Sequence, residues 1–177
     1  VKMDNFEFKC PTKIIFGADT ISKLKNEIPQ DRKILITYGG GSIRKNGVLK
    51  QVKEALEGFN YSEFGGIEPN PKFETLMNAV NMVKEGGYNF LLAVGGGSVL
   101  DGTKFIAAAS KFEGDPWDIL AKGAQVNDAL ELADVITLPA TGSEMNCGAV
   151  ISRISTKEKF AFMSEKVYPK FSINDPK

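Results

Sequence analysis

The sequence contains no histidine, and it has only two cysteines among its 177 residues. Without imidazole the chain cannot build a Ser-His-Asp or Cys-His catalytic arrangement, and it cannot supply a histidine ligand to a metal. Cys10 and Cys147 are far apart and form no Cys-x-x-Cys pair, so we expect free thiols in a cytoplasmic protein. Any chemistry of this chain alone must therefore use carboxylates, lysines, hydroxyls and backbone amides.

The sequence also lacks an apolar run of the ~20 residues that a membrane span needs, and its first residues do not resemble a signal peptide. Its 22 basic and 22 acidic residues cancel, which argues against a surface dedicated to nucleic acid or membrane. A hydrophobic content of 42% is ordinary for a globular protein, and the length suits one domain with a sizeable core.

Short β-branched runs alternate with longer helical patterns, which predicts an α/β fold with a parallel sheet flanked by helices. The residues 89–94 are nearly all apolar, as is typical of a strand in the buried middle of such a sheet. Residues 149–174 indicate short strands in a hairpin or an edge region. The predicted strands are 12–16, 33–38, 61–64, 89–94 and 135–138, and the predicted helices are 19–28, 48–56, 73–84 and 99–111.

A predicted strand runs into Gly-Gly-Gly-Ser twice, at 39–42 and at 95–98. Two turns of one type fit a doubly wound sheet that binds a two-part ligand, and two independent tight turns are the alternative. In the second turn, glycines let the backbone approach a ligand, and the following helix offers unpaired N–H groups and a partial positive charge. This combination predicts a phosphate site, in which Ser98 either caps the helix or donates to phosphate.

Two further features each have a structural and a functional interpretation. Asp101 and Lys104 lie three residues apart in a predicted helix, where a surface ion pair is the favoured interpretation and a cleft-lining carboxylate is the functional one. Residues 137–144, Thr-Leu-Pro-Ala-Thr-Gly-Ser-Glu, follow a buried strand at the sheet edge where ligands bind in such folds. The spacing of Thr141 and Glu144 also matches a helix-capping box.

Four segments in order along the chain resemble one known family. They are YGGGSIRKNG at 38–47, EPNP at 68–71, VGGGSVLDGTK at 94–104 and TLPATGSEMN at 137–146. Together they resemble iron-type (group III) alcohol dehydrogenases, nearest to the NADP-dependent butanol dehydrogenase and aldehyde reductase branch. The resemblance implies a Rossmann-like parallel sheet, namely the N-terminal domain of the fold that this family shares with dehydroquinate synthase. It also implies a homodimer that acts on an aldehyde or a primary alcohol.

The resemblance assigns roles to individual positions. It implies that the pyrophosphate lies at Gly95, Gly96, Gly97 and Ser98, and that the adenosine ribose lies by Gly40 and Ser42 with Asn70 nearby. Lys159 would contact the cofactor ribose. The nicotinamide side would be formed by Asp101, Thr137, Leu138, Thr141, Ser143 and Asn146. Of these, Asp101, Ser143 and Asn146 would also border the substrate pocket as catalytic residues.

The end of the strand at 33–38 bears on the choice of cofactor. An NAD site often places an acidic residue there to bind the ribose 2′-hydroxyl, whereas this strand ends in Tyr38 and Gly39. A glycine leaves room for a 2′-phosphate, and the basic residues Arg44 and Lys45 follow. These residues predict a preference for NADP over NAD.

Members of the family are about twice as long as this chain, and their second, helical domain supplies the metal site. Residues 1–177 therefore look like the dinucleotide-binding domain alone, with no metal ligand expected in them and with Cys10 expected away from the cleft. For the full-length protein the resemblance implies reversible reduction of an aldehyde by NADPH, with iron or zinc polarising the carbonyl. The alternatives are an isolated nucleotide-binding module and a dehydroquinate synthase-like enzyme.

Overall fold

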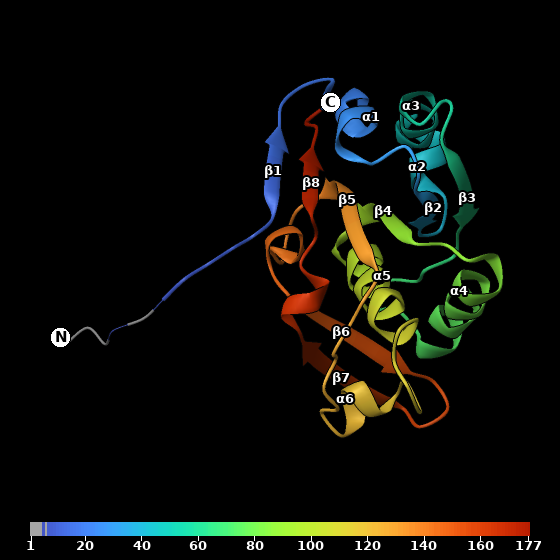
Figure 1. The fold of residues 1–177 in the computed structure, drawn as a ribbon, viewed down its shortest axis with the longest axis vertical. Helices are drawn as coiled ribbons and strands as arrows, with labels where there is room; N and C mark the ends of the chain where they lie inside the picture. Colours follow the sequence, from blue (N-terminus) through green and yellow to red (C-terminus); the bar gives the residue numbers. More distant parts are fainter. Residues whose placement is uncertain (1–4, 6) are drawn as a thin grey trace.

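The computed structural model describes residue 5 and residues 7–177, which form a six-stranded parallel sheet in the order β1-β8-β5-β4-β2-β3 (Figure 1). Every pairing in this sheet is parallel, so the predicted α/β fold is confirmed. The strands are β1 (Lys13–Phe16), β2 (Lys33–Tyr38), β3 (Asn60–Phe64), β4 (Phe90–Gly96), β5 (Glu131–Leu138) and β8 (Phe171–Asn174).

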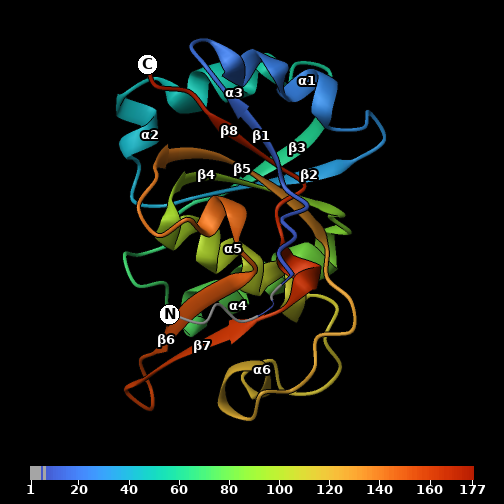
Figure 2. The same ribbon diagram turned by 90° about the vertical axis from the view of Figure 1, so that its left-hand side faces the viewer.

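Helices cover both faces of the sheet (Figure 2). One face carries η1 (Thr20–Lys23), α1 (Leu24–Glu27), α2 (Ser42–Lys45) and α3 (Val48–Ala55), and the other carries α4 (Phe73–Gly86) and α5 (Gly97–Ala109). Successive side chains of a strand point to opposite faces, so in β2 Leu35 joins the core under α4 and α5, whereas Ile34 and Ile36 join the other core. Burial on both faces explains why the central strands read as continuous apolar runs.

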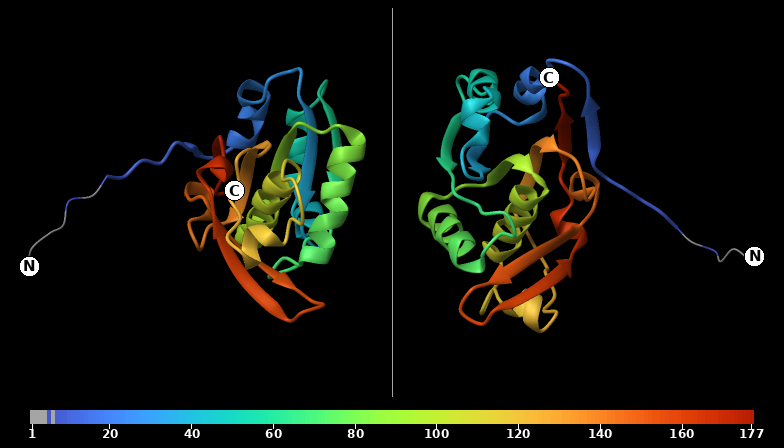
Figure 3. Two further views of the ribbon diagram at one scale, coloured as in Figure 1. Left: turned by 60° about the horizontal axis from the view of Figure 1, so that its bottom comes forward. Right: turned by 180° about the vertical axis from the view of Figure 1, so that it is seen from behind.

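A separate antiparallel hairpin is formed by β6 (Gly148–Arg153) and β7 (Glu158–Met163), at the α5 side of the sheet (Figure 3). The start of α4 holds this hairpin, because Ser152 N donates to Pro71 O at 2.9 Å and the Glu74 carboxylate accepts from the amides at the hairpin turn. The short helices α6 (Asp118–Ala121), η2 (Ser143–Met145) and η3 (Glu165–Val167) lie in the connections.

Some element predictions are corrected by the structure. Residues 19–28 form a 3-10 turn followed by one short α-helical turn, and the short helix α2 was not predicted. Only part of 149–174 is hairpin, since β8 lies inside the main sheet between β1 and β5. One of the strands that pair with β8, β1, is distant in sequence, so no local sequence pattern could have predicted the position of β8. Among the described residues, no helix combines the length and the hydropathy of a membrane span.

The direction of the strand connections reverses between β2 and β4. From β2 the chain moves outward to β3, and it then returns to β4 on the other side of β2 and continues to β5. At such a switch point the connections leave in opposite directions and a crevice opens at the carboxyl ends of the strands. The two Gly-Gly-Gly-Ser turns follow β2 and end β4, so both lie at this crevice.

Candidate functional site

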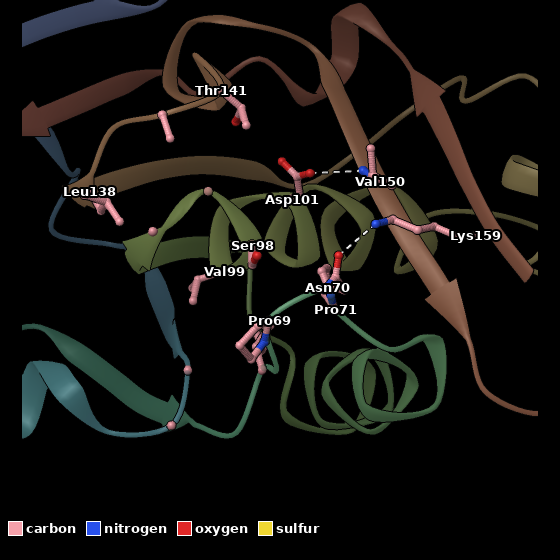
Figure 4. A pocket seen from close by; sticks show the side chains of 16 residues that line it. Pro69, Asn70, Pro71, Ser98, Val99, Asp101, Leu138, Thr141, Val150 and Lys159 are labelled. Atoms are coloured by element: carbon pink, nitrogen blue, oxygen red, sulfur yellow. Dashed lines mark hydrogen bonds between the residues drawn. The ribbon is translucent and has the colours of Figure 1, made fainter. Parts of the chain in front are cut away.

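A cavity of about 520 Å³ opens at the switch point, between the loop after β2, the start of α5 and the hairpin β6–β7 (Figure 4). Many of the predicted site residues line it together, although they come from distant parts of the sequence. They are Gly39, Gly40, Asn70, Gly96, Gly97, Ser98, Asp101, Leu138, Thr141 and Lys159. The cavity is also lined by apolar residues that the sequence did not single out, among them Ile67, Val99 and Val150.

The remaining predicted residues lie beside the cavity and outside its lining. Ser42 begins α2, and Thr137 is an exposed residue near the end of β5. Gly95 is buried beneath the turn with a φ of +157°, and a Cβ there would lie 2.8 Å from Val99 Cγ2. A glycine is thus required at 95 for close packing of β4 against α5. Ser143 and Asn146 lie behind Asp101, as described below.

The turn at Gly96 and Gly97 has the geometry of a phosphate cradle. Gly96 precedes α5, a helix of 13 residues whose first N–H groups have no partner within the helix. A Cβ on Gly97 would lie 3.2 Å from Thr141 Oγ1, so any side chain at 97 would enter the space between the helix start and the loop after β5. Ser98 lies inside the helix and lines the cavity, so its predicted role as helix cap is wrong.

The far end of the cavity is formed by Gly39, Gly40 and the Pro69-Asn70-Pro71 turn. A Cβ on Gly39 would lie 3.1 Å from Ile67 O, whereas one on Gly40 would meet no atom within 4 Å. Asn70 has a φ of +54°, and its side-chain oxygen accepts from Lys159 Nζ at 2.8 Å (Figure 4). This hydrogen bond joins the turn to β7 and places one ammonium group at the cavity.

Asp101 is a cleft-lining carboxylate, and the favoured interpretation of a surface ion pair with Lys104 is wrong. Its Oδ1 accepts from Ser143 Oγ at 2.7 Å, and its Oδ2 accepts from Val150 N at 3.0 Å (Figure 4). Asp101 therefore ties the loop after β5 to the start of the hairpin, at the wall of the cavity.

Lys104 is fully buried, because α5 is covered by protein on all sides. Its Nζ donates to oxygen atoms of Ser143, Asn146 and Gly148, at 2.7–3.0 Å. The sequence interpretation considered Lys104 only as a surface partner of Asp101 and missed its burial. The available signal was the run Phe105 to Ala109 after it, since a helix that is apolar all round is a buried helix.

The loop between β5 and β6 differs from the capping box that its sequence suggested. Its short helix η2 follows Gly142, and no side chain caps it, so the capping interpretation of Thr141 and Glu144 is wrong. Cys10 also contacts this loop, through a hydrogen bond from Sγ to Met145 O of 3.3 Å. Neither Cys10 nor Met145 lines the cavity, so this contact joins the segment before β1 to the outer side of the loop.

Asp134 is an almost fully buried carboxyl group on β5 that accepts from Ser172 Oγ at 2.5 Å. The pKa of Asp134 is raised to about 8, chiefly by burial and to a smaller extent by the nearby Glu144 carboxylate, while the hydrogen bond from Ser172 and the Lys104 ammonium oppose the change. Between about pH 4 and pH 8 the folded state therefore holds a proton that the unfolded state has released, and stability falls as the pH rises.

We expect Asp134→Asn to flatten this pH dependence. For one such group, each pH unit in this range changes the free energy of unfolding by ~1.4 kcal/mol. Each kcal/mol corresponds to a change in Tm of roughly 2–4 °C for a chain of this size. Thermal melts from pH 5 to pH 8 measure the gap in Tm between the variant and the wild type. As the pH rises, the Tm of the variant should increase relative to that of the wild type. A constant difference in Tm would contradict the raised pKa of Asp134.

The residues of this chain do not fit a site for iron or zinc. Such sites need several imidazole, thiolate or carboxylate ligands that converge on one point. The sequence has no histidine, and residues 7–177 bring together no group of three or more candidate ligands.

Comparison with known proteins places this geometry in a family. The model of the family "iron-containing alcohol dehydrogenase" matches residues 11–176. The NADPH-dependent aldehyde reductase YqhD of Escherichia coli is 57% identical over 98% of this chain, and a probable NADH-dependent butanol dehydrogenase of Bacillus subtilis is 50% identical over the same share. The chain spans 46% of the length of each of these relatives.

The solved structures of such relatives have the same fold. The crystal structure of Escherichia coli YqhD superposes with a TM-score of 0.96 at 57% identity, over 98% of this chain and 45% of that chain. The NADH-dependent butanol dehydrogenase A of Thermotoga maritima superposes with a TM-score of 0.95 at 47% identity, over the same shares. The four sequence segments, the cavity that they form and these matches agree, and the chain belongs to the iron-containing alcohol dehydrogenase family.

Proposed function

We propose that residues 1–177 are the dinucleotide-binding domain of an NADP-dependent aldehyde reductase. The observation that carries the proposal is the cavity at the switch point, where both Gly-Gly-Gly-Ser turns and the start of α5 meet. The 57% identical relative, the NADPH-dependent aldehyde reductase YqhD of Escherichia coli, supports the choice of cofactor and substrate class. Because the chain spans about half of that relative, the activity is assigned to the full-length protein.

The cavity suggests how the dinucleotide lies. Amides at Gly97 and Ser98 would bind the pyrophosphate, since a helix start favours negative charge. The adenosine ribose would lie by Gly39 and Gly40, where the absence of side chains leaves space. Lys159 would contact the second ribose, and the nicotinamide would face Asp101, Leu138 and Thr141. When bound, the nicotinamide supplies the hydride, and the protein holds it in place.

The Lewis acid of the full-length enzyme, iron or zinc, is assigned to the remainder of the protein. The residues described here do not fit it, so no step of the reaction at the metal is assigned to them. What this chain contributes is the binding and orientation of the cofactor and one wall of the substrate pocket, at Asp101, Ser143 and Asn146.

The preference for NADP can be tested by calorimetric titration. We expect the chain to bind NADP more tightly than NAD, because Gly39 leaves room for a 2′-phosphate. Arg44 contacts Glu63 and the Tyr38 hydroxyl, so the exposed Lys45 is the better candidate to neutralise the phosphate. Gly39→Asp should weaken NADP at least about tenfold, since two negative charges within ~4 Å repel by ~1–4 kcal/mol.

Gly40→Asp is the matched variant, because a Cβ at 40 meets no neighbouring atom, while one at 39 lies 3.1 Å from Ile67 O. If both variants lose the preference for NADP over NAD, the added negative charge is the cause. If only Gly39→Asp loses it, the cause is the position of residue 39 beside the 2′-phosphate, or crowding against Ile67 O. Tighter binding of NAD than of NADP by the unmodified chain would contradict the cofactor assignment. Binding of neither dinucleotide would contradict the proposed function.

We also propose that the protein is a homodimer. The edge strand β1 exposes Ile14 and Phe16, with 40% and 75% of their surface accessible. An edge strand of this kind can pair with its counterpart in a second copy. In the sequence, residues 6–16 include two apolar β-prone pieces, which predict an edge of this kind, and Phe6 lies outside the described residues. Light scattering should show a dimer that Phe16→Lys weakens, and a monomer at high concentration would count against the proposal.

A further inference from the structure

The connection between β5 and β6 forms the polar wall beside the cavity, and it has little hydrogen bonding of its own. Within residues 141–148, here called the 141–148 loop, Met145 N donates to Gly142 O at 2.9 Å and Gly148 N donates to the Asn146 side chain at 3.0 Å. Two longer hydrogen bonds run from Asn146 N to Ser143 O at 3.5 Å and from Asn146 Nδ2 to Thr141 O at 3.4 Å. The loop nevertheless turns the carbonyl oxygens of Ser143, Asn146 and Gly148 inward, toward α5. A group outside the loop must therefore hold this conformation.

That group is the ammonium of Lys104. It lies 2.7 Å from Ser143 O, 3.0 Å from Ser143 Oγ, 2.9 Å from Asn146 O, 3.0 Å from Asn146 Oδ1 and 3.0 Å from Gly148 O. An ammonium has three N–H donors, and five oxygen atoms surround it. Acceptors thus outnumber donors, which is the arrangement of a cation in an oxygen cage.

A neutral side chain of the same size cannot replace this cation. The oxygens of the cage are turned toward one another, and a buried acceptor without a donor costs roughly 1–3 kcal/mol. Removing only one partner of a buried charged group destabilises a protein more than replacing all the partners by apolar residues of similar volume. The loop would therefore change conformation if the positive charge were lost, so that its carbonyl groups could find water.

The cage is connected to the cavity through Ser143 and Asp101. Ser143 Oγ accepts from Lys104 and donates to Asp101 Oδ1 at 2.7 Å, and Asp101 Oδ2 accepts from Val150 N at 3.0 Å. Asp101 and Val150 line the cavity. A displaced 141–148 loop would thus move the wall on the nicotinamide side, whereas Gly39 and Gly40 at the adenosine end make no contact with this chain of hydrogen bonds.

We propose that Lys104 is a positioning residue whose buried ammonium holds the 141–148 loop and, through it, the nicotinamide side of the site. The proposal rests on the proposed function, because it assumes that the cavity binds a dinucleotide. Lys104 acts through Ser143, Asn146 and Asp101, and it does not touch the cofactor itself.

The first test compares two ligands on Lys104→Met. This change keeps the length of the side chain and removes the charge. We expect NADP to bind at least about tenfold more weakly, which corresponds to the loss of one buried hydrogen bond to a charged group. The ligand 2′,5′-ADP, which lacks the nicotinamide half, should bind as it does to the wild type. Lys111→Met, a change at an exposed lysine just after the same helix, should alter neither affinity.

The second test needs no substitution at Lys104. Burial lowers the pKa of the Lys104 ammonium to about 8, while the carboxylates of Asp101, Asp134 and Glu144 and the Cys147 thiol raise it. These groups face it from α5, β5, η2 and the segment before β6. As the pH rises from 7 to 9.5 the charge is lost, so NADP affinity should fall and 2′,5′-ADP affinity should stay constant. Asp134→Asn should retain this profile, and it is the necessary control because the pKa of Asp134 itself is raised to about 8. Cys147→Ala, which removes the thiol beside the ammonium, should retain the profile as well.

The outcomes are distinguishable. If the wild type binds both ligands and Lys104→Met binds NADP equally well, the positioning role is overturned and the proposed function stands. If the wild-type NADP affinity is constant from pH 7 to pH 9.5, or if its pH dependence disappears in Asp134→Asn, the role is also overturned. If Lys104→Met does not fold, the wild-type pH profile decides. If the wild type binds neither ligand, the proposed function fails and this proposal fails with it.

Discussion

Gly97→Val is expected to weaken NADP binding by about a hundredfold or more. A Cβ at this position would lie 3.2 Å from Thr141 Oγ1, so the branched side chain would occupy the space between the start of α5 and the loop after β5. Phosphate could then no longer reach the amides of Gly97 and Ser98. Hydrogen bonds to a charged group contribute ~1.5–3 kcal/mol each, and the loss of two such bonds corresponds to the stated factor.

A graded series separates the blocked site from a damaged fold. Gly97→Ala adds only one methyl group, so we expect a smaller loss of affinity than for valine. Residue 97 begins the helix and has no positive φ, so both variants should melt near the wild-type temperature. Calorimetric titration with NADP measures the affinities. An unchanged affinity in a folded Gly97→Val chain would show that the pyrophosphate lies elsewhere.

The 177-residue chain is expected to reduce no aldehyde, even with added metal. The proposed reduction uses a divalent metal as a Lewis acid in the full-length protein, and the described residues bring together no group of three or more ligands that could hold one. The cavity also has only the walls that this half of the protein supplies. With NADPH, butanal and added Zn²⁺ or Fe²⁺, turnover should equal that of the protein-free control, although NADP still binds.

The NADPH-dependent aldehyde reductase YqhD of Escherichia coli is the positive control for the same assay. Bound metal is measured in parallel by elemental mass spectrometry, and the chain should hold far less than one iron or zinc per molecule. Turnover clearly above the protein-free control, or one bound metal per chain, would show that the catalytic site lies in this half.

Local patterns were sufficient for much of this protein. The mainly apolar runs at 33–38 and 89–94 correspond to β2 and β4, because a strand buried on both faces must be apolar at nearly every position. The glycines at 39–41 and 95–97 indicated where a backbone must come close to another group. Since parallel strands end at one edge of the sheet, residues as distant as Gly40 and Leu138 line one cavity.

The sequence by itself therefore determined the fold class through its strand and helix patterns, and the family through the resemblance of four segments; its two glycine-rich turns also indicated where the cavity lies. The tertiary structure alone decided the partners of the polar groups. Lys104 meets oxygens that lie 39 to 44 residues away, Cys10 meets Met145, and β8 enters the sheet between β1 and β5. A polar side chain in a buried helix must find a partner, but which partner depends on long-range packing that residue spacing does not encode.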